Sequence, residues 1–107
     1  MKKTFESELE RLTIKLISIE AGKINKKIYS TRFKIKRNFS VIFYEEVQPV
    51  YSQILQLFKE YKIKPNEKSM KEYSMSFLEK EIKMTDSKAH KILYDRIESG
   101  KYKFKLK

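Results

Sequence analysis

The sequence predicts a mainly α-helical domain with a small β-ribbon, which places it in the α+β class. Apolar residues recur at helical spacing in four stretches of the 107-residue chain, 4–20, 40–62, 70–82 and 86–99. Two other segments, 31–37 and 101–106, alternate apolar and basic residues, which is the period of a strand. The chain has only two glycines and two prolines, which favours a compact helical protein with few turns.

The first helix is expected over residues 4–20, ending at Ala21–Gly22. Thr4 supplies a side-chain oxygen that can cap its N-terminus. Its apolar residues are spaced alternately four and three apart, at Phe5, Leu9, Leu12, Leu16 and Ile19. Such a stripe suits a helix that lies on the core of its own domain, and it also suits the seam of a homodimer.

Two strands are expected to pair with each other as a ribbon. Residues 23–29 are ambiguous, because Ile24 and Ile28 suit a helical turn but the segment is short and strongly basic. The strands are expected over 31–37 and 101–106. A lone strand leaves its backbone groups unpaired, so each segment needs the other. One face would carry the apolar side chains of Phe33, Ile35, Tyr102, Phe104 and Leu106. The other face would carry Lys34, Lys36, Lys101, Lys103 and Lys105.

Pro49 divides the second helical stretch, 40–62. Proline removes a backbone donor and disfavours a helical conformation of the preceding residue, so we expect a kink or a new helix start there. From the proline onward the apolar stripe is continuous, at Val50, Ile54, Leu57, Phe58 and Tyr61. A linker containing Pro65 leads to the helix over 70–82, for which Ser69 is the expected cap.

The last part of the chain predicts a tight turn at 83–85 and an amphipathic helix over 86–99. Thr85 or Asp86 is expected to cap this helix. Gly100 is expected to end it, because glycine readily adopts the left-handed conformation of a C-terminal cap.

The segment from Phe77 to Phe104 resembles a winged helix-turn-helix domain. The resemblance is carried by residue classes, at Phe77-Leu78, Met84-Thr85, Ala89, Ile92-Leu93, Ile97 and Gly100, followed by the strand. It divides the chain into an N-terminal helix and basic strand, 1–38, which would serve dimerisation, and a winged helix-turn-helix core, 39–107.

The resemblance implies how DNA would be bound. In such domains the second helix of the pair enters the major groove, so residues 86–99 would be the recognition helix. The implied contacts from this helix and its start are Thr85, Ser87, Lys88, His90, Lys91 and Tyr94. The ribbon lysines, Lys34, Lys36, Lys101, Lys103 and Lys105, would bind flanking phosphates and add affinity without sequence information.

The net charge of +11 is concentrated in two segments far apart in the sequence. Residues 21–38 hold seven basic residues and no acid, and residues 83–107 hold eight basic residues against three acids. Clustering of this kind is typical of a surface that binds phosphates. The predicted ribbon would join the two clusters into one surface.

The composition argues against an enzyme. The chain has no cysteine and one histidine, His90, so we expect no metal centre. It has no glycine-rich phosphate loop and no relay that would activate a nucleophile, so we expect no cofactor and no small-molecule substrate.

Acidic residues interrupt the N-terminus, and no apolar run approaches the ~20 residues of a membrane span. We therefore expect a cytoplasmic protein.

These patterns predict sequence- or shape-dependent binding of double-stranded DNA by a homodimer. A small transcription regulator fits this expectation, and so does an accessory factor of a plasmid or mobile element, as in a relaxosome. Two other classes stay open. A basic protein bound to RNA or to the ribosome would also use aromatic residues beside lysines. A phage-type inhibitor of an acidic protein would use the same lysine-rich surface.

Overall fold

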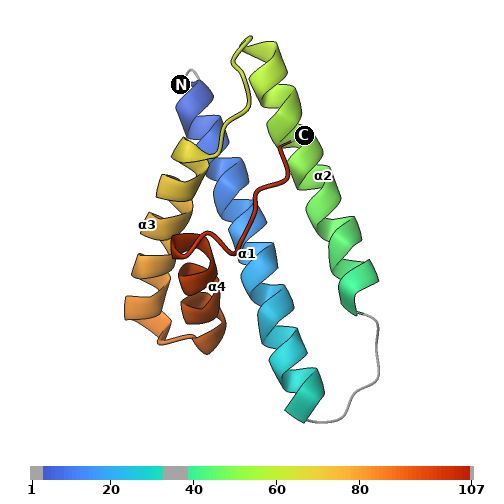
Figure 1. The fold of residues 1–107 in the computed structure, drawn as a ribbon, viewed down its shortest axis with the longest axis vertical. Helices are drawn as coiled ribbons and strands as arrows, with labels where there is room; N and C mark the ends of the chain where they lie inside the picture. The colour runs from blue at the N-terminus through green and yellow to red at the C-terminus, as the bar shows by residue number, and fades with distance from the viewer. Residues whose placement is uncertain (1–3, 33–38, 107) are drawn as a thin grey trace.

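The computed structural model is an assembly of four α-helices followed by an irregular C-terminal tail (Figure 1). It describes residues 4–32 and 39–106, and their side chains in 4–28 and 47–106. The helices are α1 (Phe5–Arg32), α2 (Phe39–Glu60), α3 (Lys68–Thr85) and α4 (Lys88–Glu98).

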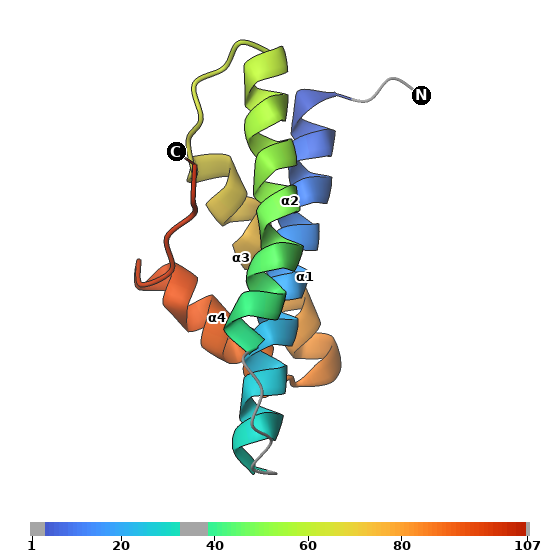
Figure 2. The ribbon, with the colours of Figure 1, turned by 90° about the vertical axis from the view of Figure 1, so that its right-hand side faces the viewer.

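The central helix is α1, which contacts α2, α3 and α4. α2 runs antiparallel along one side of α1, and α3 and α4 pack on its other side (Figure 1). The C-terminal tail leaves α4 and crosses α1 toward α2, as the two perpendicular views show (Figure 2).

Two clusters of buried side chains form the core. The first lies mainly between α1 and α2 and contains Leu9, Leu12, Leu16, Val47, Val50, Tyr51, Ile54, Leu57, Phe58 and Met70. The second joins α1, α3 and α4 and contains Ile17, Ala21, Leu78, Leu93 and Ile97. Phe104 packs against both clusters, so the tail bridges them.

The predicted β-ribbon, and with it the winged helix-turn-helix fold, is wrong. Residues 101–106 form no strand, and none occurs elsewhere in the described residues. The alternation in the tail has another cause. Tyr102, Phe104 and Leu106 pack against the helical core, while the lysines between them are exposed. An extended segment lying on helices shows the same period of two, because its successive side chains point to opposite sides.

The segment expected to pair with the tail, 31–37, also differs from the prediction. Its first two residues end α1. The rest of it, including Lys34 and Lys36, lies outside the described residues.

α1 begins as predicted but continues past its predicted end at Ala21–Gly22. The backbone N–H of Ser7 donates to Thr4 Oγ1 at 3.1 Å, which caps the helix. A glycine inside a helix costs only about 1 kcal/mol relative to alanine. Burial of apolar side chains on two sides of α1 outweighs that cost, since each fully buried aliphatic side chain stabilises the fold by roughly 1.5–3 kcal/mol.

The apolar stripe of α1 is covered within its own chain. Leu9, Leu12 and Leu16 pack with buried residues of α2. Ile17 and Ala21, on the other side of the helix, pack with α3 and α4. The stripe that suggested a homodimer seam is therefore part of the core of the single chain.

α2 remains helical through Pro49, so the predicted new helix start is absent. Four residues of its predicted apolar stripe are buried, as expected: Val50, Ile54, Leu57 and Phe58. The fifth, Tyr61, lies just after the helix and is exposed. The helix ends with Lys62 at a positive φ of 55° and the N–H of Ile63 donating to the carbonyl of Phe58 at 2.9 Å. That bond is typical of a Schellman C-terminal motif.

α3 and α4 confirm the predicted pair of helices joined by a tight turn, with a shifted boundary. α3 continues to Thr85, whose hydroxyl donates to the carbonyl of Glu81 at 2.8 Å. The turn consists of Asp86, with φ 53°, and Ser87. Ser87 caps α4, because its side-chain oxygen accepts from the N–H of His90 at 3.4 Å.

The two glycines are expected to respond oppositely to substitution by alanine. Gly100 has φ +81°, where a side chain is strained, so Gly100→Ala should destabilise the protein by about 1–2 kcal/mol. Gly22 lies inside α1 and a Cβ there would meet nothing within 4 Å, so Gly22→Ala should stabilise it by roughly 0.5–1 kcal/mol. Urea unfolding followed by circular dichroism measures both changes. Destabilisation by Gly22→Ala would contradict a continuous α1.

Candidate functional site

The predicted recognition helix, α4, presents a face of mixed charge. Lys88 and Lys91 are exposed, as expected for contacts with DNA. Lys91, however, forms an ion pair with Asp86. Asp95 and Glu98 are also exposed, so the acids on this face balance its basic residues. α4 alone is therefore not a strongly positive surface.

Four other residues expected to contact DNA are in contact with other parts of the chain. The hydroxyl of Thr85 donates to the Glu81 carbonyl in the last turn of α3, and that of Ser87 accepts from the His90 N–H at the start of α4. The hydroxyl of Tyr94 donates to Glu79 Oε1 at 2.9 Å, which links α4 to α3. His90 is half-buried, its ring centroid lies 6.4 Å from that of Phe77, and its Nδ1 is buried without a hydrogen-bond partner. His90 is therefore only partly open to a ligand, and its Nδ1 lies on the covered side of the ring.

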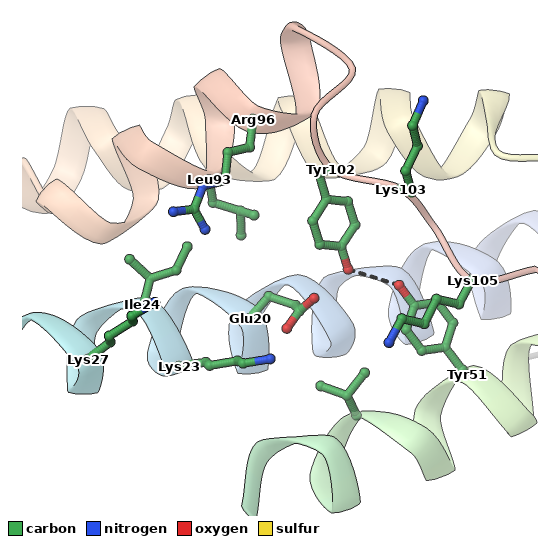
Figure 3. A pocket seen from close by; sticks show the side chains of 11 residues that line it. Glu20, Lys23, Ile24, Lys27, Tyr51, Leu93, Arg96, Tyr102, Lys103 and Lys105 are labelled. Atoms are coloured by element: carbon green, nitrogen blue, oxygen red, sulfur yellow. Dashed lines mark hydrogen bonds between the residues drawn. The ribbon is translucent and has the colours of Figure 1, made fainter. Parts of the chain in front are cut away.

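A cleft of about 420 Å³ lies where α1, α2, α4 and the tail meet (Figure 3). Its lining residues are Glu20, Lys23, Ile24, Lys27, Val47, Tyr51, Leu93, Arg96, Tyr102, Lys103 and Lys105. The four residues from α1 are spaced three, one and three apart, which places them on one side of a helix. The prediction that α1 ends at Gly22 hid this pattern.

The cleft brings the two basic segments of the sequence together. Lys23 and Lys27 come from the first segment, and Arg96, Lys103 and Lys105 come from the second. Glu20 is the one carboxylate among the eleven lining residues, so the cleft is strongly cationic. Figure 3 shows the amino groups of Lys23 and Lys105 directed toward the middle of the cleft and that of Lys103 directed away from it.

Two of the lysines that the sequence predicts as DNA contacts lie at this cleft. Lys103 and Lys105 line the cleft, whereas Lys101 lines a neighbouring hollow that shares Arg96 with the cleft. Lys23 and Lys27 were missed because they precede the predicted strand.

A hydrogen bond between two tyrosines holds the tail at the cleft. The hydroxyls of Tyr51, on α2, and Tyr102, in the tail, lie 2.8 Å apart (Figure 3). The ring of Phe104 packs edge-on against Tyr102, with centroids 5.0 Å apart. Burial raises the pKa of both phenols above 10.0, and the neighbouring charge of Glu20 adds to the rise in each. Both hydroxyls therefore stay protonated at neutral pH.

The tyrosine pair predicts a loss of stability at alkaline pH. A raised pKa means that the folded state holds the phenol proton more tightly than the unfolded state, so this stability is complete below pH 10.0 and is lost as the pH rises above it. Tyr102→Phe should cost about 0.5–1.5 kcal/mol at pH 8 through the lost hydrogen bond. The difference between wild type and variant should shrink above pH 10.0. Urea unfolding at a series of pH values measures it, and a constant difference would contradict the assignment.

Within the part of the chain that the structure describes, each helix is too short or too polar to span a bilayer. Within these described residues, no three His, Asp or Glu side chains lie close enough together to hold a metal ion.

Comparison with known protein families, with curated proteins and with solved structures finds no match.

Proposed function

We propose that this protein binds double-stranded DNA through phosphate contacts centred on the cationic cleft. The observation that carries the proposal is that five basic residues from α1, α4 and the tail line one cleft: Lys23, Lys27, Arg96, Lys103 and Lys105. Basic side chains gathered on one surface release counterions from the nucleic acid when they neutralise its phosphates, and this release drives binding.

In this proposal α4 borders the binding surface and contributes to it. Arg96 belongs to both the helix and the cleft, and Lys88 lies exposed two turns earlier on α4. With few arginines available for bidentate contacts to guanine, the surface is suited to shape-dependent binding more than to direct base readout. A cytoplasmic regulator of transcription, or an accessory factor of a plasmid, is the role that we propose for such a protein.

The salt dependence of duplex binding tests this proposal. A labelled duplex of roughly 20 bp, about two helical turns, is titrated with the protein at several salt concentrations and followed by fluorescence anisotropy. If the five cations each neutralise one phosphate, the slope of log K against log salt is about −4.5. A structured RNA of equal length serves as competitor. Absence of duplex binding at low salt, or preference for the RNA, would overturn the proposal.

A further inference from the structure

We propose that Glu20 is a positioning residue for phosphate binding, because its carboxylate fixes the tail that brings Lys103 and Lys105 to the cleft. The carboxylate favours the binding of an anion in this way although its own charge repels one. This inference deepens the proposed function and rests on it. The ligand remains the phosphate backbone of the duplex, and the inference identifies the residue that holds part of its binding surface in place.

An acidic residue in this cleft has no direct use for a phosphate ligand. Glu20 is half-buried and is the one acidic residue among the eleven that line the cleft. A carboxylate repels phosphate and only accepts hydrogen bonds, so contact with the ligand would weaken binding. Figure 3 shows the carboxylate of Glu20 directed toward the hydroxyl of Tyr102. Its use in the cleft therefore lies in a contact within the protein.

Glu20 is one end of a chain of hydrogen bonds that joins α1, α2 and the tail. Its carboxylate is hydrogen-bonded to the hydroxyl of Tyr102. The hydroxyls of Tyr102 and Tyr51 lie 2.8 Å apart, and the backbone of Lys105 is hydrogen-bonded to the hydroxyl of Tyr51. Because a carboxylate only accepts, Tyr102 donates to Glu20, Tyr51 donates to Tyr102, and the N–H of Lys105 donates to Tyr51. Each hydroxyl then donates once and accepts once.

This chain fixes the part of the tail that carries the cleft lysines. The backbone of the tail is joined to α4 at its start, where the N–H of Tyr102 donates to the carbonyl of Arg96 at 2.9 Å. Phe104 packs on both core clusters, but apolar contact has no preferred direction. The hydrogen bond to Tyr51 is made by Lys105, the tail residue whose amino group is directed toward the middle of the cleft (Figure 3).

Docking of the tail and binding of phosphate are therefore coupled. Lys103 and Lys105 are two of the five basic residues of the cleft, and they line it because the tail lies across α1. A ligand that binds the docked form more tightly shifts the tail toward docking, and a change that weakens docking weakens the ligand by the same factor. Removal of the acceptor at Glu20 is such a change.

Two substitutions of Glu20 test the inference, because both remove the charge and only one removes the acceptor. Glu20→Gln keeps an amide oxygen that accepts from Tyr102, whereas Glu20→Ala does not. A labelled blunt duplex of roughly 20 bp is titrated with each variant of the full chain at low salt and followed by fluorescence anisotropy. We expect Glu20→Ala to bind about threefold to tenfold more weakly than Glu20→Gln, the factor that corresponds to one hydrogen bond. Equal affinities would show that Glu20 acts by its charge alone and would overturn the inference.

The same comparison in a Tyr102→Phe background shows whether Glu20 acts through that hydroxyl. Neither side chain then has a donor to accept from, so the difference between Glu20→Ala and Glu20→Gln should vanish. A difference that persists would report packing at this position and would contradict the inference. Glu10→Ala and Glu10→Gln are the matched controls and should bind equally tightly, since Glu10 lies exposed on the same helix outside the cleft. Unchanged circular dichroism verifies that all variants are folded.

Hydrogen exchange of the tail, measured by mass spectrometry without DNA, separates this inference from the proposed function. The C-terminal peptide that contains Lys105 should exchange about threefold to tenfold faster in Glu20→Ala than in Glu20→Gln, because its tail opens more often. Equal exchange in the two variants, or faster exchange with equal duplex affinities, would overturn this inference and leave the proposed function intact. Absence of duplex binding by the wild type at low salt would overturn the proposed function and, with it, the inference.

Discussion

Substitution of Leu93 by alanine is expected to lower the free energy of unfolding by about 2–5 kcal/mol. Leu93 is 1% exposed and is the central buried residue of α4. It packs in the second core cluster with residues of α1 and α3. The substitution removes apolar surface and leaves a cavity that the surrounding helices fill only in part. Such a loss is a large fraction of the total stability of a small domain, which is commonly about 5–15 kcal/mol.

Urea unfolding followed by circular dichroism measures this change. Ile63→Ala is the control, because Ile63 follows α2 in the linker and is 39% exposed. Its substitution should cost less than about 1 kcal/mol, as for most surface positions. The Leu93 variant should also weaken duplex binding, since Leu93 lines the cleft. Similar losses of stability in the two variants would contradict the packing of α4 on α1 and α3.

Reversal of charge at two positions of the cleft is expected to have the largest effect on binding. Lys23→Glu combined with Arg96→Glu should lower the affinity for a duplex by about tenfold or more, because two phosphate contacts are lost and two repulsive charges are added. The slope of log K against log salt should become shallower by about 2. Anisotropy titrations at several salt concentrations measure both quantities.

A second double variant separates the effect of the cleft from that of net charge. Lys15→Glu combined with Lys71→Glu makes the same change in net charge at exposed positions of α1 and α3 outside the cleft. This variant should change affinity much less, since charges on the solvated surface are screened beyond about 10 Å at 0.1 M salt. Equal losses in the two double variants would show that the total charge, and not the cleft, determines binding.

Local patterns in the sequence were sufficient for most of the helices. The stripe from Val50 to Phe58 predicts the buried face of α2, and Gly100 predicts the end of α4. Both are properties of the nearest neighbours in the chain, the helical period in one case and the φ angle of a single residue in the other. The boundary between α3 and α4 was predicted less well because Thr85, Asp86 and Ser87 can all cap a helix, and only the position of the turn selects Ser87.

Where local patterns failed, packing between distant segments decided the outcome. The sequence predicts that α1 ends at Gly22, but burial of Ala21 against α3 and α4 keeps the helix continuous. The alternation of Tyr102, Phe104 and Leu106 predicts a strand, but these side chains pack on helices instead. A period of two shows that a segment is extended with one side buried, and it does not show what covers that side.

The order of the amino acids suffices to show that the protein is basic, that its charge lies in two segments and that its helices carry apolar stripes. Which basic residues meet depends on how the helices pack. Because α1 continues beyond Gly22, Lys23 and Lys27 lie on the side of that helix where Arg96 and the tail pack. The cleft exists because helices and a tail from distant parts of the chain bury their apolar residues together, and contacts of that range leave no periodic trace in the sequence.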